Sequence, residues 1–541
     1  MNRRERGSTP SNTSDGPFAR IHGSSAPPRS PIKNSQYGKG GQELGLSLKR
    51  VIGTTCQTVT CFDCLPLSRA FAYTAGAAAV VATMDAQGSI SQRFYRANPV
   101  QSVSGPRGLS LNGLGRDTSD IRYKSPLPNR DFPSSLSPRA GPGDWNDSPA
   151  GKQGNVKERV RAATALSFSP NGRYVAVGET GYKPRVLIFS LDEKAPQDIP
   201  VAVIHEHSFG VHALAFSPDS KHLASLGTAN DGFLYVWSID DRTGGVGLVA
   251  SNKCTNMVKQ MAWIGQQIIT VGVRFVKIWR PSEVAPPSNN DTPERRSASA
   301  PKPLAGRNAL LGNLLDATFT CVVPMSEDKA ALCTDGGDVC ILDDTERSQR
   351  LTRVDNVAFN ITAACLDSSS RLIVTGVNGN TKLLNIAELQ NAFVPQTAVP
   401  SSCASGKNSP TRTTHFVAVG SLADFVVTVD NNHGIQLRHA PTCDADERFL
   451  EETMYDVPAH SDAVLGVRAL PMPNHLNASF LTWSAGGTVM FWSPDCDMKA
   501  GFRVAMSQSV DMYNIVNELK SVASSTSVPK TISGDRYGVL R

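Results

Sequence analysis

Two segments of this chain, ALSFSPNGRYVAVG at 165–178 and ALAFSPDSKHLASLG at 213–227, repeat one pattern 48 residues apart. Each reads as an alternating apolar run, a Ser-Pro turn and a second apolar run, which predicts two strands joined by a tight turn. A third apolar run with an aromatic residue near its end follows each copy, RVLIFS and FLYVWS. A strand-rich unit that recurs every forty-odd residues is typical of a β-propeller blade.

We therefore expect an all-β protein, a seven-bladed WD-repeat β-propeller followed by an incomplete second propeller. The first propeller is predicted over residues 48–440, in blades that begin near residues 48, 158, 201, 246, 304, 349 and 391. Residues 441–541 predict a partial second propeller, with an eighth blade at 455–493. Residues 1–47 and the insertions at about 98–157, 282–303 and 401–414 are rich in Ser, Pro and Gly, and we expect them to be disordered.

Charge and cysteine content limit the partners and the compartment. A net charge of +6 over 541 residues is mild, so neither nucleic acid nor an anionic membrane is expected as the main partner. The 11 cysteines are scattered and most lie in apolar runs, which indicates a reducing compartment. The polar N-terminus does not predict a signal peptide, and the most apolar stretch, 70–84, is too short to span a bilayer. We expect a soluble, cytoplasmic protein.

The predicted third blade contains four residues that match the hydrogen-bonded tetrad of WD repeats. His207 precedes its first strand, Ser225 lies in the second, Asp231 follows in a turn and Trp237 lies in the third. The types His, Ser and Asp could also form a catalytic triad, but their placement inside one predicted sheet favours a structural network.

The predicted eighth blade offers only a partial tetrad. It contains His460, Ser484 and Trp492, but Gly486 stands where the Asp is expected. We therefore expect an incomplete network and a weaker blade.

No motif marks an enzyme or a cofactor site. Cys61 and Cys64 have C-x-x-C spacing, but a zinc site needs a second pair of ligands and a redox site needs a helix. Packed strand thiols are the favoured interpretation, and His205-Glu206-His207 is a weak metal candidate because His207 belongs to the tetrad. We predict no catalytic residue, no metal and no cofactor.

The segments outside the predicted blades hold candidate phosphorylation sites. Ser or Thr precedes Pro at seven positions, and a phosphate there would change local charge enough to switch a docking event. These candidate sites are Thr9, Ser30, Ser125, Ser137, Ser148, Thr292 and Ser409.

Several segments together resemble the mitogen-activated protein kinase-binding protein family, which includes a WD-repeat scaffold of spindle poles. They are LKRVIGTT, TALSFSPNGRYVAVGETGYKPRVLIF, EHSFGVHALAFSPDSKHLASLG, VASNKCTNMVKQMAWI, ITVGVRFVKIW, GRNALLGNL and FLTWSAGGTVMFW. The resemblance implies two tandem seven-bladed propellers, followed by a long tail to which kinase docking and self-association are attributed. We expect this sequence to be truncated relative to that plan, since Arg541 falls within a predicted blade.

The function that follows is a non-enzymatic scaffold for protein–protein interactions, in MAP-kinase signalling or in mitotic spindle and centrosome organisation. Its partners would be proteins or peptides, kinases among them, bound on the propeller faces. The alternative is a propeller subunit or reader in a nuclear or ubiquitin-ligase complex. Capture of kinases and centrosomal proteins would favour the first function, and capture of ligase or chromatin subunits the second.

Overall fold

A computed structural model describes residues 48–85, 88–97, 160–281, 302–345, 349–387, 414–440, 455–503, 519–524 and 531–535. All of them belong to one compact unit, Leu48–Arg541. The predicted N-terminal tail and almost all of the three predicted insertions lie outside the described residues. No helix in the described ranges has the length and apolarity that a membrane crossing needs.

The described secondary structure consists of strands and short 3-10 turns, which confirms the all-β prediction. The first sheet contains β1 (Phe62–Leu65), β2 (Ala70–Ala75), β3 (Ala78–Met84) and β4 (Ile90–Tyr95). The second contains β5 (Ala163–Phe168), β6 (Tyr174–Glu179), β7 (Val186–Ser190) and β8 (Ala202–Ile204). The third contains β9 (Val211–Phe216), β10 (His222–Gly227), β11 (Phe233–Ile239), β12 (Val246–Lys253) and β16 (Lys302–Pro303). The fourth contains β13 (Val258–Ile264), β14 (Gln267–Gly272), β15 (Phe275–Arg280) and β17 (Ala305–Asn308).

The next four sheets continue in chain order. The fifth contains β18 (Phe319–Pro324), β19 (Lys329–Thr334), β20 (Asp338–Asp343) and β21 (Arg350–Asn356). The sixth contains β22 (Ile361–Leu366), β23 (Arg371–Gly376) and β24 (Thr381–Asn385). The seventh contains β25 (Phe416–Leu422), β26 (Phe425–Asp430), β27 (Ile435–His439) and β28 (Tyr455–Val457). The eighth contains β29 (Val464–Ala469), β30 (Phe480–Ser484), β31 (Thr488–Trp492) and β32 (Met498–Arg503).

A hairpin and four 3-10 turns complete the described elements. The hairpin pairs β33 (Leu519–Ser524) with β34 (Thr531–Asp535). The turns are η1 (Val59–Cys61), η2 (Pro66–Ser68), η4 (Gly312–Leu314) and η6 (Val377–Gly379).

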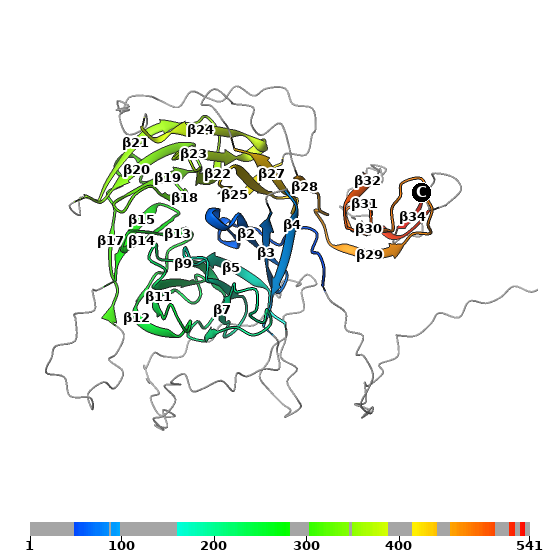
Figure 1. Ribbon diagram of the computed structural model, residues 1–541. Coiled ribbons are helices and arrows are strands. Elements are labelled where there is room, and N and C mark those ends of the chain that lie inside the picture. The colour runs from blue at the N-terminus through cyan, green and yellow to red at the C-terminus, as the bar shows by residue number, and fades with distance from the viewer. Residues whose placement is uncertain are drawn as a thin grey trace, which may run out of the picture. The chain divides into compact units, whose positions relative to one another are not determined.

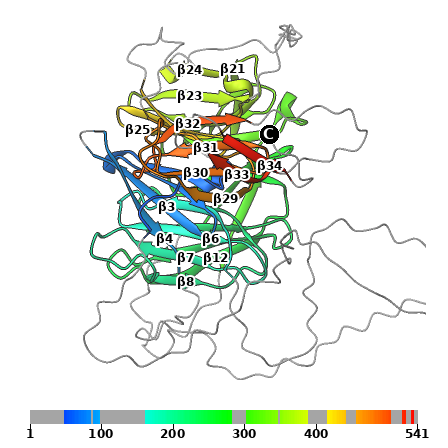
Figure 2. The ribbon, with the colours of Figure 1, turned by 90° about the vertical axis from the view of Figure 1, so that its right-hand side faces the viewer.

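The first seven sheets form a closed ring (Figure 1). The innermost strands contact one another in the order β1, β5, β9, β13, β18, β22 and β25, and β25 contacts β1 again. Apolar clusters fill the spaces between consecutive sheets, so each sheet buries both of its faces. The eighth sheet continues the pattern of four antiparallel strands (Figure 2).

The boundaries of the sheets differ from those of the sequence repeats by one strand. The segment VGLVASN was predicted to open the fourth blade, but it forms β12 and pairs with β11 as an outer strand of the third sheet. Likewise β28 completes the seventh sheet, so residues 455–457 do not belong to the partial second propeller as predicted. Each repeat begins with the outer strand of the preceding sheet, because a hairpin turn carries the chain from third to fourth strand before it returns to the centre.

The second predicted insertion, 282–303, ends too late. Lys302–Pro303, placed within a disordered segment, forms β16 and pairs in parallel with β12. Leu304 is fully buried beside it and donates its backbone N–H to Ser251 O at 3.0 Å.

Side chains on the innermost strands join neighbouring sheets through hydrogen bonds. The hydroxyl of Thr164 donates to the carbonyl of Val211 in the next sheet at 2.7 Å. Thr320 donates to Ile361 at 3.0 Å, and Thr362 donates to Phe416 at 2.6 Å. In each bond the threonine is the second residue of its innermost strand, and the carbonyl belongs to the first residue of the next innermost strand. These bonds join the second sheet to the third, the fifth to the sixth and the sixth to the seventh.

Candidate functional site

The four predicted tetrad residues meet in the third sheet. The Trp237 indole N–H donates to Ser225 Oγ at 2.9 Å, and the same oxygen lies 2.9 Å from His207 Nε2. His207 Nδ1 lies 2.6 Å from Asp231 Oδ2, and the backbone N–H of Ser208 donates to Asp231 Oδ1 at 2.7 Å. The network therefore runs from the middle of the sheet to the turn that joins its second and third strands.

The electrostatics of this network favour a structural role. Burial raises the pKa of Asp231, but hydrogen bonds from His207 and Ser208 outweigh it, and the pKa lies below its ordinary value. Ser225 is fully buried, and its oxygen is held between the imidazole and the indole. A nucleophilic serine needs an exposed oxygen beside its base, and this one has no path to a substrate.

The structure corrects the predicted tetrad of the eighth sheet. His460 Nε2 lies 2.7 Å from Thr482 Oγ1, and the Trp492 indole donates to the same oxygen at 2.8 Å. Ser484 Oγ is buried without a hydrogen-bond partner, so Thr482 and not Ser484 supplies the central hydroxyl. Both residues point to the same face of β30, because they are two residues apart on one strand.

Asp462 replaces only in part the aspartate that was expected at Gly486 in the eighth sheet. A side chain at Gly486 would lie 1.9 Å from Asp462 Oδ2, so the Asp462 carboxylate occupies the space where the turn aspartate was expected. His460 Nδ1 nevertheless has no hydrogen-bond partner, and burial lowers the pKa of His460. The network is thus incomplete at the histidine.

Two further sheets have residues at the positions of this network that the sequence reasoning missed, and in the fourth sheet they form a hydrogen bond. In the fourth sheet, the Trp279 indole donates to Thr270 Oγ1 at 2.9 Å. In the seventh sheet, the corresponding positions hold Thr428 and Arg438: Thr428 pairs with Gln436 across β26 and β27, and Arg438 follows two residues later. The signal was available in the third-strand sequences, where GIQLR aligns with FVKIW and FLYVW.

A second candidate site is an exposed apolar surface on one edge of the ring. The loops that lead into the innermost strands and the turns between second and third strands share this edge, because the innermost strand runs away from it and the second strand returns. We call six of the exposed apolar side chains of these loops the rim surface: Tyr182, Phe209, Met257, Val273, Leu310 and Leu315. They come from loops of the second to fifth sheets.

Contacts between loops connect the members of the rim surface. The rings of Tyr182 and Phe209 lie 6.1 Å apart at 61°, and their backbones form an isolated bridge. The N–H of Val273 donates to Met257 O at 3.1 Å, and Val273 also bridges to Thr318. Loops of neighbouring sheets are therefore fixed against each other beneath the apolar side chains.

Lysines surround this surface. Lys183 Nζ lies 5.6 Å from the centre of the Tyr182 ring, and Lys253 Nζ lies 5.8 Å from that of Phe233. Lys259 is exposed on the neighbouring strand. None of the ion pairs in the described part of the chain involves these three lysines. The border of the surface thus has lysines on the second to fourth sheets, and an exposed ion pair of Arg274 with Asp316 beside Val273 and Leu315.

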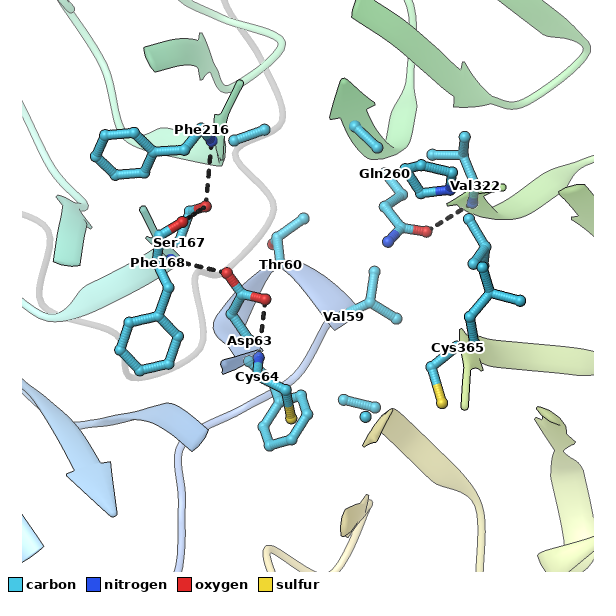
Figure 3. Close-up of a pocket in the computed structure, with 18 of the residues that line it drawn as sticks. Val59, Thr60, Asp63, Cys64, Ser167, Phe168, Phe216, Gln260, Val322 and Cys365 are labelled. Carbon is cyan, nitrogen blue, oxygen red and sulfur yellow. Dashed lines mark hydrogen bonds between the residues drawn. The ribbon is translucent and has the colours of Figure 1, made fainter. Parts of the chain in front are cut away.

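A cavity of about 660 Å³ lies at the centre of the ring, lined by the innermost strands of all seven sheets (Figure 3). Its polar side chains join the sheets. Asp63 Oδ2 accepts the N–H of Phe168 at 2.8 Å, and Gln260 Oε1 accepts the N–H of Val322 at 2.8 Å. Burial raises the pKa of Asp63 to about 6 from its ordinary 3.8, against the lowering effect of its hydrogen bonds. The polar groups of the cavity therefore support the ring itself.

A comparison with protein families places the tetrad in a known repeat. A family model described as "WD domain, G-beta repeat" matches residues 199–238, which include His207, Ser225, Asp231 and Trp237. This chain contains a WD40 repeat.

Its relatives are distant and longer. Mitogen-activated protein kinase-binding protein 1 of Mus musculus is 26% identical over 361 residues, which cover 62% of this chain and 22% of that protein. WD repeat-containing protein 62 of Sus scrofa is 28% identical over 64% of this chain and 22% of its own length. Cilia- and flagella-associated protein 52 of Chlamydomonas reinhardtii is 28% identical over 41% of this chain and 34% of its own length. The alignments thus span about a fifth to a third of each relative.

Solved propellers are similar in outline. The structure of Saccharomyces cerevisiae Sqt1 is 13% identical with a TM-score of 0.43, over 85% of this chain and 99% of that one. The WD40 β-propeller domain of Doa1 is 9% identical with a TM-score of 0.41, over 72% and 95%.

The remaining predicted site residues are buried thiols, one exposed histidine and one histidine of the tetrad. Cys61 Sγ donates to Thr164 O at 3.0 Å, and burial raises the pKa of Cys64 well above its ordinary value. Both are packed thiols, and His205 is exposed while His207 is buried in the tetrad. No group of three metal-binding side chains occurs in the described ranges. All seven candidate phosphorylation sites lie outside those ranges.

Proposed function

We propose that this chain is a non-enzymatic scaffold that binds partner proteins on the rim surface. The observation that carries the proposal is the gathering of six exposed apolar side chains at one edge of four successive sheets. Exposed apolar surface in contact with water is costly, and a patch with a polar border is typical of an interaction site. The WD40 fold is typically non-catalytic and commonly binds proteins, which agrees with this role.

We propose further that the scaffold acts in mitogen-activated protein kinase signalling or in spindle and centrosome organisation, in the cytoplasm, at the spindle pole or in the nucleus. The name of its relative mitogen-activated protein kinase-binding protein 1 supports the first of these pathways. Kinases are therefore candidate partners of this chain.

Residues 458–541 are proposed to begin a second ring. The innermost strand of the eighth sheet, β29, exposes Val464, Leu465 and Val467, whereas the innermost strand of the seventh sheet is largely buried. The hairpin β33–β34 contacts β29 and β30, as the next sheet of a ring would.

The test of the scaffold role compares captured proteins. The full chain, a Tyr182→Ser/Phe209→Ser variant and a Leu67→Ser control would each be immobilised and exposed to cell extract, with quantitative mass spectrometry of bound proteins. Leu67 is 93% exposed and lies in η2, between a first and a second strand and hence at the opposite edge. We expect a specific set of proteins to be lost from the double variant and retained by the control. Identical sets on all three would contradict the proposal.

A further inference from the structure

The turn that carries Tyr182 and Lys183 is fixed at its base and at its tip. It joins β6 to β7, and at its base the Arg185 guanidinium donates to both carboxylate oxygens of Glu179, at 2.8 and 2.7 Å. Glu179 is buried, so this bidentate ion pair is shielded from solvent and holds a defined geometry. At the tip, the N–H of Lys183 donates to Ser208 O in the third sheet at 2.9 Å. Tyr182 and Lys183 therefore project from a rigid base.

Backbone hydrogen bonds continue from this turn along the loops of the next two sheets. Within the third sheet, the N–H of Thr228 donates to Gly210 O at 2.8 Å. The N–H of Cys254 donates to Gly232 O at 2.7 Å, and the loop that begins at Cys254 leads to Met257. Loops of the second to fourth sheets thus form one connected strip beneath the rim surface. Rigid side chains lose little conformational entropy when a partner binds, which favours affinity.

The exposed charge on this part of the rim surface is mainly positive. Three exposed lysines lie here: Lys183, Lys253 and Lys259. Glu206 is the one exposed acid in the described loops and turns at this edge of the second to fourth sheets. Arg274 is balanced by its ion pair with Asp316. A partner segment that carries carboxylates is therefore attracted to this strip, and a basic segment is repelled.

Apolar and cationic groups lie next to one another on the strip. Tyr182 and Met257 are 67% and 60% exposed, so apolar area is available for contact. Lys183 Nζ lies 5.6 Å from the centre of the Tyr182 ring, so a partner residue packed on that ring brings its neighbours within reach of the ammonium group. The partner that matches this surface carries acidic residues beside large apolar ones.

Single-stranded nucleic acid also combines negative charge with apolar surface, but the rim surface fits it less well. Such ligands stack successive bases on aromatic side chains along a cationic groove. The rim surface continues instead with the aliphatic side chains of Val273, Leu310 and Leu315. Asp316 beside them is exposed and repels phosphate. A peptide partner is therefore favoured.

We propose that the rim surface binds acidic segments of partner proteins, in which Asp or Glu residues flank large apolar residues. The apolar side chains pack on Tyr182, Phe209 and Met257, and the carboxylates accept hydrogen bonds from the ammonium groups of Lys183 and Lys253. Apolar burial supplies most of the affinity, and charge selects the sequence. This inference rests on the proposed scaffold role and names the chemistry of the partner.

The test begins with a random dodecapeptide phage library, from which binders are selected on the immobilised full chain. Enriched peptides are synthesised with a fluorescein label, and fluorescence anisotropy measures their affinity for wild type and for three variants. These are Phe209→Ser, the charge reversal Lys183→Glu/Lys253→Glu and the matched control Lys221→Glu. Lys221 is exposed in the turn between β9 and β10, at the opposite edge. Circular dichroism verifies that each variant is folded.

We expect the enriched peptides to carry acidic residues beside aromatic or aliphatic ones. They should bind wild type and Lys221→Glu equally, and Phe209→Ser and the charge reversal at least about tenfold more weakly. A version of the tightest peptide with lysine in place of each acid should bind the charge reversal more tightly than wild type. Affinity of the acidic peptide for wild type should fall when salt rises from about 0.05 M to about 0.5 M.

The outcomes that contradict the inference also separate it from the scaffold role. Neutral peptides that bind Phe209→Ser weakly but bind the charge reversal as tightly as wild type would overturn the acidic preference and leave the scaffold role intact. Peptides that bind Phe209→Ser as tightly as wild type would overturn both. A library that yields no binder would overturn the inference, as would a labelled oligouridine that binds wild type but neither rim variant, because it assigns the surface to nucleic acid.

Discussion

Arg438 of β27 and Trp237 of β11 occupy the same register position in two sheets of one ring. Each lies two residues beyond the partner of a central hydroxyl, Thr428 in one sheet and Ser225 in the other. Trp237 donates its indole N–H to that hydroxyl, whereas Arg438 leaves Thr428 without a partner. One position of the repeat thus stabilises the third sheet and leaves a polar site in the seventh.

Exchange of these two residues should therefore have opposite effects on stability. Arg438→Trp removes a buried charge and supplies an indole donor for Thr428, so we expect the free energy of unfolding to rise by about 1–3 kcal/mol. The reverse change, Trp237→Arg, creates a buried charge beside Ser225 and should lower it by about 3 kcal/mol or more. Urea unfolding followed by tryptophan fluorescence and circular dichroism measures both. A loss of stability in Arg438→Trp would count against this account.

The tetrad predicts the cost of removing one oxygen. Ser225→Ala leaves the buried nitrogens His207 Nε2 and Trp237 Nε1 without their shared partner, and we expect a loss of about 2–4 kcal/mol. Ser238→Ala in the same sheet removes one exposed hydroxyl and should change stability by less than about 0.5 kcal/mol. Urea denaturation compares the two variants. Similar values for both would mean that the tetrad does not stabilise the sheet.

The hydrogen bonds between innermost strands predict which strands open locally when one of these bonds is removed. Thr362→Val keeps the shape of the side chain but removes the 2.6 Å bond to Phe416 O, at a cost of about 1 kcal/mol. Hydrogen exchange by mass spectrometry should show faster exchange in β22 and β25, with β5 and β9 unchanged. Uniform acceleration over the whole ring would instead indicate global unfolding and contradict a local connection between the sixth and seventh sheets.

Asp63 predicts a pH dependence of stability. Burial raises its pKa in the folded chain from 3.8 to about 6, so between these values the unfolded chain loses its proton first and unfolding becomes easier as pH rises. The Asp63→Asn side chain does not titrate, so the variant lacks this decrease in the free energy of unfolding. Relative to wild type, the variant should gain stability from pH 3.8 to about 6 and show a constant difference above that. A difference that does not change with pH would show that Asp63 titrates normally.

Local patterns in the sequence predicted the strands and the four residues of the third-sheet tetrad. Alternation of apolar residues and turn chemistry depend on neighbours in the chain, so they can be read without the fold. The sequence could not show which sheets β12 and β28 belong to. Hydrogen bonds to the preceding sheet assign an outer strand, and these bonds are not visible in the sequence. The repeat pattern therefore located strands correctly but divided them at the wrong place.

The central hydroxyl of the eighth sheet shows the same limit. Thr482 and Ser484 share one face of β30, and spacing from His460 does not distinguish them because the preceding loop has its own length. The register between β30 and β31 identifies Thr482: it pairs with Met490, which lies two residues before Trp492, as the partner of Ser225 lies two residues before Trp237. The position of Arg438 relative to Thr428 likewise depends on the register between β26 and β27.

The claim that the rim surface binds proteins is tested most directly by photo-crosslinking from within it. A photoreactive benzoylphenylalanine would replace Phe209 in one full-length chain and Leu67, at the opposite edge, in another. After irradiation in cells, we predict protein adducts from position 209 that are lost when Tyr182→Ser is added, and none of these adducts from position 67. The same adducts from both positions, or none from position 209, would contradict the account.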